Sequence, residues 1–157
     1  KLNDIMNGKF VKKNLGNVFY QKNKYEFNIK NLSMGLKTFA ILKILLENNS
    51  LKEKGTIILD EPEIHLHPEW QVLFAELIVL LQKEFEMHIL LTTHSPYFLK
   101  AIQVFSRKYE IFDKCKYYIG EIDGEESTII DTTDNLENIF YKLTIPFENL
   151  MNEEEVL

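Results

Sequence analysis

The chain has 157 residues, of which 45% are hydrophobic and 27% are charged, and its formal net charge at pH 7 is −6. This mixture is typical of one globular domain and excludes disorder, and no apolar run approaches the roughly 20 residues of a membrane span. The first four residues, Lys-Leu-Asn-Asp, lack a signal-peptide layout, and the single cysteine, Cys115, cannot form an internal disulfide. We therefore expect a cytoplasmic protein.

Charge is unevenly distributed along the chain. Residues 1–30 carry seven lysines against Asp4 and Glu26, whereas the remainder is acidic, and Arg107 is the only arginine. A basic segment could contact nucleic acid. Because there is one arginine and no nucleic-acid motif, we interpret these lysines as the solvated faces of short strands.

The N-terminal third predicts a short helix, three short strands and a longer helix. Apolar residues at helical spacing place the first helix at residues 2–6, before Asn7-Gly8. The strands are predicted at 10–11, 18–20 and 25–29, separated by polar breaks at 14–17 and 22–24. From Met34 to about Glu47, apolar residues recur at helical spacing.

The middle of the chain predicts a βαβ unit. Two compact apolar strands, Thr56–Leu59 and His88–Thr92, flank a helix that begins at Pro68 and runs to about Phe85. The absence of polar alternation predicts that the first strand is buried on both faces. Since the strands are parallel, their carboxyl ends open at one edge of the sheet, where ligands bind in α/β folds.

The C-terminal third predicts a helix, a hairpin and a last helix. A helix starts at Ser95-Pro96 and runs to about Val104. Strands at 116–122 and 127–131 then form a hairpin that turns at Asp123-Gly124, and the last helix spans about 136–143, before Pro146.

Ionisable residues follow both strands of the βαβ unit. Asp60-Glu61 comes directly after the first strand, and His94 follows the second. Two carboxylates and an imidazole suit metal-assisted hydrolysis, in which one carboxylate holds Mg²⁺ through water, the other orients the attacking water, and the imidazole contacts an anionic oxygen. The alternative is a strand end capped by solvated acids.

The start of the helix at Met34 is a candidate anion site. Ser33 is a favourable N-cap, and Gly35 in the first turn removes a side chain that would block close approach. Free N–H groups and the positive end of the helix dipole attract anions there. Simple capping by Ser33 is the alternative.

The order of these motifs resembles the second half of an ABC-type ATPase domain, closest to its SMC-like, RecF-like and OLD-like "AAA family" branch. Four segments carry the resemblance, which extends from about Leu2 to Leu150: the signature motif (Leu32-Ser33-Met34-Gly35-Leu36-Lys37), Walker B with its catalytic glutamate (Thr56 to Glu61), the D-loop (Glu63-Ile64-His65-Leu66-His67-Pro68) and the switch-histidine loop (Thr93-His94-Ser95-Pro96). Met34 and Leu36 depart from the small and polar residues usual in the signature.

The resemblance implies an α/β fold in which residues 1–157 form a single domain, the C-terminal portion of a P-loop NTPase head. It implies ATP and Mg²⁺ as cofactors, with Asp60 holding Mg²⁺, Glu61 polarising water and His94 sensing the γ-phosphate. Contacts to the nucleotide of the facing head fall to Ser33, Gly35, Lys37 and His67. A homodimer of heads is the implied assembly, with DNA or a second effector protein as further partners in DNA repair, chromosome handling or defence against phage.

The phosphate loop of such heads is missing from the sequence. Its pattern, G-x-x-x-x-G-K-[ST], needs two glycines five apart, and no pair among the six glycines at 8, 16, 35, 55, 120 and 124 has that spacing. The resemblance places this loop upstream of Lys1. We therefore expect ATPase activity only when the chain is joined to such a segment.

Two other classes of function stay open from sequence. One is a metal-dependent nuclease or phosphatase that works without nucleotide and groups Asp60, Glu61 and Glu63 with the histidines at 65, 67 and 94. The other is a non-catalytic interaction domain that retains only a docking surface.

Overall fold

The computed structural model describes residues 2–13, 18–124 and 126–154. Its helices are α1 (Leu2–Ile5), α2 (Met34–Glu47), α3 (Pro68–Phe85), α4 (Pro96–Lys108) and α5 (Leu136–Glu154), with short 3₁₀ turns at Ile29–Asn31 and Phe112–Lys114. Its strands are β1 (Lys9–Lys12), β2 (Val18–Lys22), β3 (Tyr25–Asn28), β4 (Thr56–Leu59), β5 (His88–Leu91), β6 (Tyr118–Asp123) and β7 (Glu126–Asp131).

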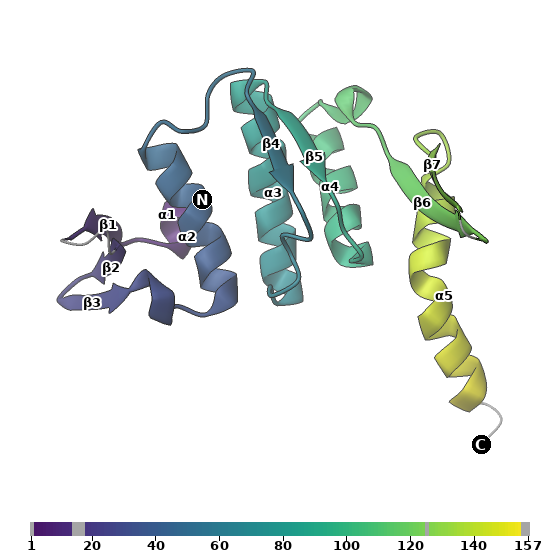
Figure 1. Cartoon of the computed structure of the whole chain (residues 1–157), viewed down its shortest axis with the longest axis horizontal. Helices are drawn as coiled ribbons and strands as arrows, with labels where there is room; N and C mark the ends of the chain where they lie inside the picture. Colours follow the sequence, from purple (N-terminus) through teal and green to yellow (C-terminus); the bar gives the residue numbers. More distant parts are fainter. Residues whose placement is uncertain (1, 14–17, 125, 155–157) are drawn as a thin grey trace.

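These elements follow one another across an elongated molecule (Figure 1). In the described ranges, β1, β2 and β3 form an antiparallel sheet, β4 pairs with β5 in parallel, and β6 pairs with β7 as an antiparallel hairpin. The predicted break at 14–17 lies outside the described residues. None of the helices in these ranges has the length and hydropathy needed to cross a membrane.

Local capping explains where α2 and α3 begin. The Oγ of Ser33 accepts a hydrogen bond from the backbone N–H of Leu36 at 3.4 Å, which caps the start of α2. Pro68 occupies the first turn of α3, and the preceding His67 is its N-cap. Both helices have the bounds predicted from the sequence.

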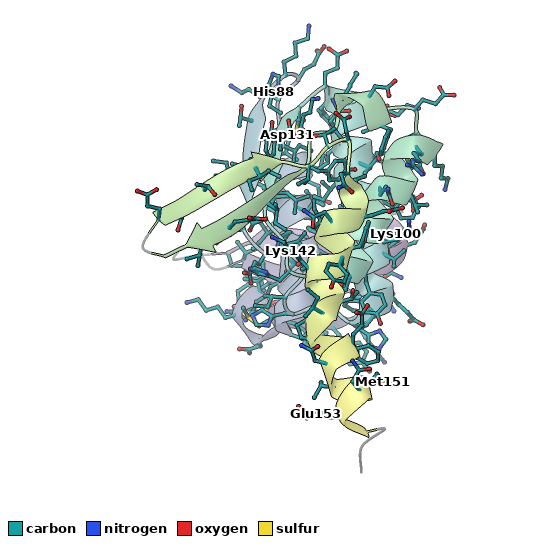
Figure 2. The ribbon with its side chains drawn as sticks, turned by 90° about the vertical axis from the view of Figure 1, so that its right-hand side faces the viewer. His88, Lys100, Asp131, Lys142, Met151 and Glu153 are labelled. Atoms are coloured by element: carbon teal, nitrogen blue, oxygen red, sulfur yellow. The ribbon has the colours of Figure 1, made fainter. Side chains whose placement is uncertain are left out.

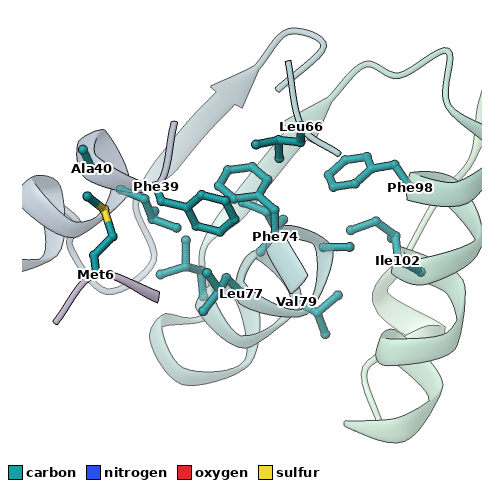
Figure 3. Packing of buried hydrophobic residues seen from close by; sticks show 14 of the residues in the cluster. Met6, Phe39, Ala40, Leu66, Phe74, Leu77, Val79, Phe98 and Ile102 are labelled. Carbon is teal, nitrogen blue, oxygen red and sulfur yellow. The ribbon is translucent and has the colours of Figure 1, made fainter. Parts of the chain in front are cut away.

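Aromatic contacts hold α2, α3 and α4 together. Phe39 of α2 makes edge contacts with Trp70 and Phe74 of α3, at ring-centroid distances of 5.6 and 5.3 Å. Phe74 in turn stacks on Phe98 of α4 at 6.3 Å, so the core is continuous across the three helices (Figure 3). The first turns of α2 and α3 are thereby fixed relative to each other.

The parallel pairing of β4 and β5 is confirmed, but the predicted burial of β4 on both faces is wrong. The strands pair in register from Thr56 opposite His88 to Leu59 opposite Leu91. Helices α3 and α4 lie behind them on one face only (Figure 1). Because side chains alternate between faces, Ile58 and Leu90 point away from the helices and are 69% and 59% exposed.

The C-terminal helices are longer than predicted. Helix α4 extends to Lys108, and α5 continues through Pro146 to Glu154 instead of ending at residue 143. Pro146 removes one N–H from the helical ladder, but it is exposed, so water can hydrate the carbonyl that loses its partner.

The hairpin of β6 and β7 projects to one side of α5 (Figure 2). A second apolar cluster, built around Leu99, Tyr117 and Ile139, joins this region to α4.

Candidate functional site

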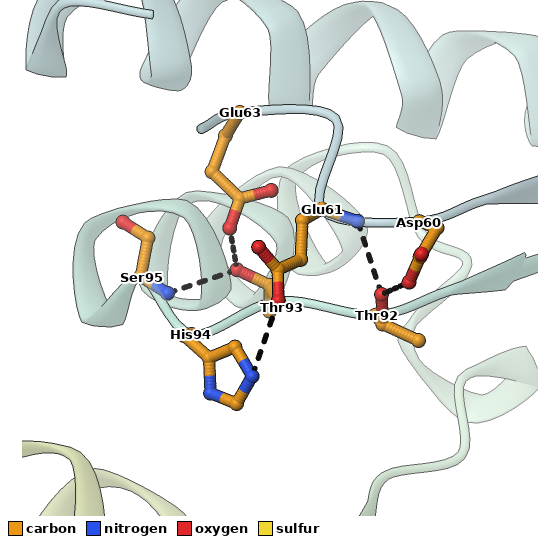
Figure 4. Close-up of polar contacts among 7 residues, drawn as sticks. All are labelled: Asp60, Glu61, Glu63, Thr92, Thr93, His94 and Ser95. Carbon is orange, nitrogen blue, oxygen red and sulfur yellow. Dashed lines mark hydrogen bonds and ion pairs between the residues drawn. The ribbon is translucent and has the colours of Figure 1, made fainter. Parts of the chain in front are cut away.

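The carboxyl ends of β4 and β5 bring Asp60, Glu61 and His94 to one edge of the sheet (Figure 4). The Nε2 atom of His94 lies 3.3 Å from Oε1 of Glu61. The side chain of Glu61 is 36% exposed and that of His94 is 84% exposed, so both can reach a ligand from solvent. The pair therefore places a possible base and a possible hydrogen-bond donor side by side at a surface that a ligand can reach.

Thr92 fixes the turn that presents the two carboxylates. Its hydroxyl donates to Oδ1 of Asp60 at 2.6 Å and accepts from the N–H of Glu61 at 3.0 Å. Glu61 has a φ of 41°, in the left-handed region that L-residues rarely adopt. The threonine hydroxyl thus bridges two consecutive residues of this turn and sets the direction of both side chains.

The Asp60 carboxylate has the donor chemistry that Mg²⁺ prefers. It is exposed, and carboxylate and water oxygens are the ligands of this hard cation, which keeps several of its waters when bound. A single exposed carboxylate therefore fits one ligand position of a hydrated Mg²⁺.

A second group of predicted residues lines an open pocket of about 370 Å³ between the starts of α2 and α3. Its walls are Ser33, Met34, Gly35, His65, His67 and Trp70. The predicted residues Ser33, Gly35 and His67 meet there, whereas Lys37 is not among the lining residues, and its Nζ lies 3.9 Å from Sδ of Met34. Trp70 was not predicted as a site residue, and it both packs against the core and borders the pocket.

Gly35 is buried against the loop between β4 and α3. A Cβ atom at this position would lie 2.9 Å from the backbone oxygen of His65 and 3.2 Å from Cδ2 of Leu66. The glycine therefore allows a close approach by the backbone of the loop between β4 and α3 of the same chain, whereas the approach predicted from sequence was that of an anion. Gly35 and His65 both line the pocket, so this contact forms part of its wall.

We expect Gly35→Ala to lower the free energy of unfolding by about 1–3 kcal/mol, because a backbone carbonyl cannot move aside as a side chain would. Urea unfolding followed by circular dichroism measures the change. Gly120→Ala is the matched control, since a Cβ there would meet nothing within 4 Å. Equal unfolding free energies for the two variants would contradict the role assigned to Gly35.

The side chains of the metal-cluster alternative do not come together in the described part of the chain. There, no three His, Cys, Asp or Glu side chains are grouped so that they could hold a metal ion. His67 instead caps α3, its Nδ1 accepting from the N–H of Glu69 at 3.4 Å. The side chains at 63, 65, 67 and 94 thus do not join Asp60 as a ligand set.

The loops behind the site contain polar contacts that the sequence did not predict. Glu63 is buried, with 3% exposure, and accepts a hydrogen bond from the hydroxyl of Thr93. Ser95 donates through its Oγ to Oε1 of Gln71 at 2.5 Å. These partners are 30 and 24 residues apart in the chain, and no periodic pattern signals such pairings.

Comparison with known proteins gives one family model, described as "AAA domain, putative AbiEii toxin, Type IV TA system", which matches residues 6–100. The chain is 32% identical over 107 residues to "Retron Vc95 probable ATPase" of Vibrio cholerae serotype O1 biovar El Tor, covering 61% of the chain and 20% of that protein. It is 29% identical over 123 residues to "OLD nuclease" of Thermus scotoductus, covering 78% and 23%. The chain thus spans about a fifth of each relative.

The fold also resembles a solved chain from work described as "Structural biochemistry of ATP-driven dimerization and DNA stimulated activation of SMC ATPases". The TM-score is 0.59 at 15% sequence identity, and the match covers 87% of this chain and 80% of the other. At this identity the likeness establishes the fold. The predicted α/β class, with its parallel strand pair and resemblance to an ATPase head, is confirmed.

Proposed function

Because the chain belongs to the AAA domain family whose model matches residues 6–100, and so to the SMC-like and OLD-like ATPases, we propose that it is the signature- and Walker B-bearing part of an ATPase head. The head would bind and hydrolyse ATP between two copies of itself. The observation that carries this proposal is the pairing of Glu61 with His94 across the carboxyl ends of two parallel strands.

Each residue at the strand ends has a distinct role in the proposed reaction. The Glu61 carboxylate accepts a hydrogen bond from the attacking water and polarises it. His94, exposed beside Glu61, donates to an oxygen of the γ-phosphate. Asp60, oriented by the hydroxyl of Thr92, would hold Mg²⁺ through water. When bound, the cation neutralises negative charge on the phosphates.

The open pocket is proposed to receive the nucleotide of the facing head. Ser33 and Gly35 lie in the first turn of α2, where backbone N–H groups and the helix dipole favour a phosphate. His67 lines the same pocket. Lys37 does not line it, but it adds positive charge to the N-terminal part of the same helix. Each site would then combine the phosphate loop of one head with the signature of the other.

The names of the relatives support a link to nucleic acid or to an effector. One curated relative is a retron ATPase, another is a nuclease, and the solved SMC ATPases are described as stimulated by DNA. We propose that ATP turnover by this head is coupled to DNA or to a second effector protein, in DNA repair, chromosome handling or defence.

The proposal is tested by ATP binding with and without a phosphate loop. We expect the 157-residue chain alone to bind Mg-ATP poorly, because its sequence lacks the phosphate loop, whose N–H groups and lysine bind the β- and γ-phosphates. The protein in which the chain is joined to its phosphate-loop segment should bind and hydrolyse ATP. Isothermal calorimetry measures both, and micromolar affinity of the chain alone, or no hydrolysis by the joined protein, would contradict the proposal.

A further inference from the structure

We propose that Glu63 and Thr93 are positioning residues that hold the loop carrying His94 against the loop that lines the pocket. This inference rests on the proposed ATPase function. The two loops are residues 60–67, after β4, and residues 92–96, after β5. The first leads from Asp60 and Glu61 to the pocket histidines, and the second carries His94. Glu63 and Thr93 join them near their midpoints (Figure 4).

The environment of Glu63 indicates that this contact serves more than packing. Its side chain is buried, Oε1 accepts from Thr93, and Oε2 has no hydrogen-bond partner among the described residues. Burying a carboxylate with one oxygen unpaired destabilises a fold compared with an apolar residue of the same size. The hydrogen bond from the Thr93 hydroxyl explains why a carboxylate is present at this buried position.

The contact belongs to a chain of hydrogen bonds between the two loops. Thr93 Oγ1 accepts from the N–H of Ser95 at 3.0 Å while donating to Glu63. The Ser95 hydroxyl donates to Gln71, whose Nε2 donates to the carbonyl of Leu66 at 3.1 Å. The residues on both sides of His94 are thus anchored to the segment between β4 and α3, although the imidazole itself stays exposed.

The same segment forms one side of the pocket. Leu66 and the backbone of His65 press against Gly35, and His67 lines the cavity. A nucleotide or partner that binds in the pocket therefore contacts a loop that is also hydrogen-bonded to Thr93 through Glu63 and, by way of Gln71, to Ser95. We infer that these bonds keep His94 aligned with Glu61 when the pocket is occupied.

The test uses steady-state ATP hydrolysis by the protein that joins this chain to its phosphate-loop segment. Thr93→Val removes the hydroxyl at nearly constant volume and should lower kcat by about 10- to 100-fold, the effect expected of a small misplacement. The KM for ATP should change less than about twofold, because the nucleotide contacts remain. Thr93→Ser, which keeps the hydroxyl, should restore most of kcat.

Two further variants separate positioning from stability. Thr132→Val is the matched control, since Thr132 is also buried and its hydroxyl donates to the carbonyl of Tyr117 at 3.3 Å, away from the site. It should lose thermal stability and keep kcat. Glu63→Leu should also lower kcat, and the double variant should be no slower than Thr93→Val alone, because Thr93→Val already removes the contact that Glu63→Leu removes.

The possible results separate this inference from the proposed function. Wild-type kcat retained in Thr93→Val, or lowered equally in Thr132→Val, would overturn the positioning role and leave the ATPase assignment intact. Additive losses in the double variant would also overturn it. Absence of ATP hydrolysis by the wild-type protein would overturn the proposed function and this inference together.

Discussion

We expect Glu61→Gln to lower ATP turnover by at least about tenfold in the protein that includes the phosphate-loop segment, in line with typical general-base contributions of 10²-fold or more. Glutamine keeps the size and hydrogen-bonding reach of the side chain but cannot polarise the attacking water as a carboxylate does. The glutamine side chain can still reach Nε2 of His94, so the site remains filled. Nucleotide should still bind, and the ATP-bound dimer should persist longer.

Phosphate release gives the turnover, and size-exclusion chromatography with ATP gives the lifetime of the dimer. Glu137→Gln makes the same change at an exposed position in the first turn of α5 and should leave turnover unchanged. Unaltered turnover in Glu61→Gln would show that another group activates the water.

A second large effect is expected at Ser33, where Ser33→Arg should abolish ATP-driven dimerisation while each protomer still binds ATP. Ser33 is exposed, lies at the start of α2 and lines the pocket, so an arginine there fills the space proposed for the nucleotide of the facing head. Ser33→Ala removes only the cap, costs about 1 kcal/mol of stability and should leave turnover nearly unchanged. Ser50→Arg, beyond the opposite end of α2, controls for the added charge and bulk.

Mixed dimers test whether the pocket acts across the interface. When one protomer carries Ser33→Arg and the other lacks a working phosphate loop, one composite site stays intact: the Ser33→Arg protomer holds ATP against the normal signature of its partner. When both changes lie in one protomer, neither site is complete. Activity should therefore survive only in the first arrangement, and equal activity in both would mean that the signature acts within its own chain or not at all.

Structural features that depend on residues close together in the sequence were predicted correctly. Ser33 before an apolar helical repeat, and Pro68 at the next helix start, placed α2 and α3 at the bounds observed. The two short apolar segments were predicted as parallel strands, and this predicted that Asp60 and His94 would share a sheet edge. Spacing and capping carry this information because both act within a few residues.

Features that depend on neighbours distant in sequence were not predictable. An apolar run does not reveal what covers each face, so the exposure of Ile58 was missed. Pro146 was taken as a helix end, whereas solvent exposure lets α5 continue past it. The contact of Glu63 with Thr93 spans 30 residues and leaves no local pattern.

The left-handed backbone conformation of Glu61 favours glycine for stability, whereas the proposed chemistry requires a carboxylate at the same position. A residue with a side chain pays roughly 1–2 kcal/mol for this conformation, whereas glycine adopts it freely. The Thr92 hydroxyl accepts a hydrogen bond from the N–H of Glu61 and so helps to stabilise the turn in this unfavourable conformation. Thermostability alone would therefore select glycine here and discard the carboxylate. A laboratory evolution experiment that screens only for heat resistance would drift toward well-folded proteins that lack the carboxylate proposed to activate water.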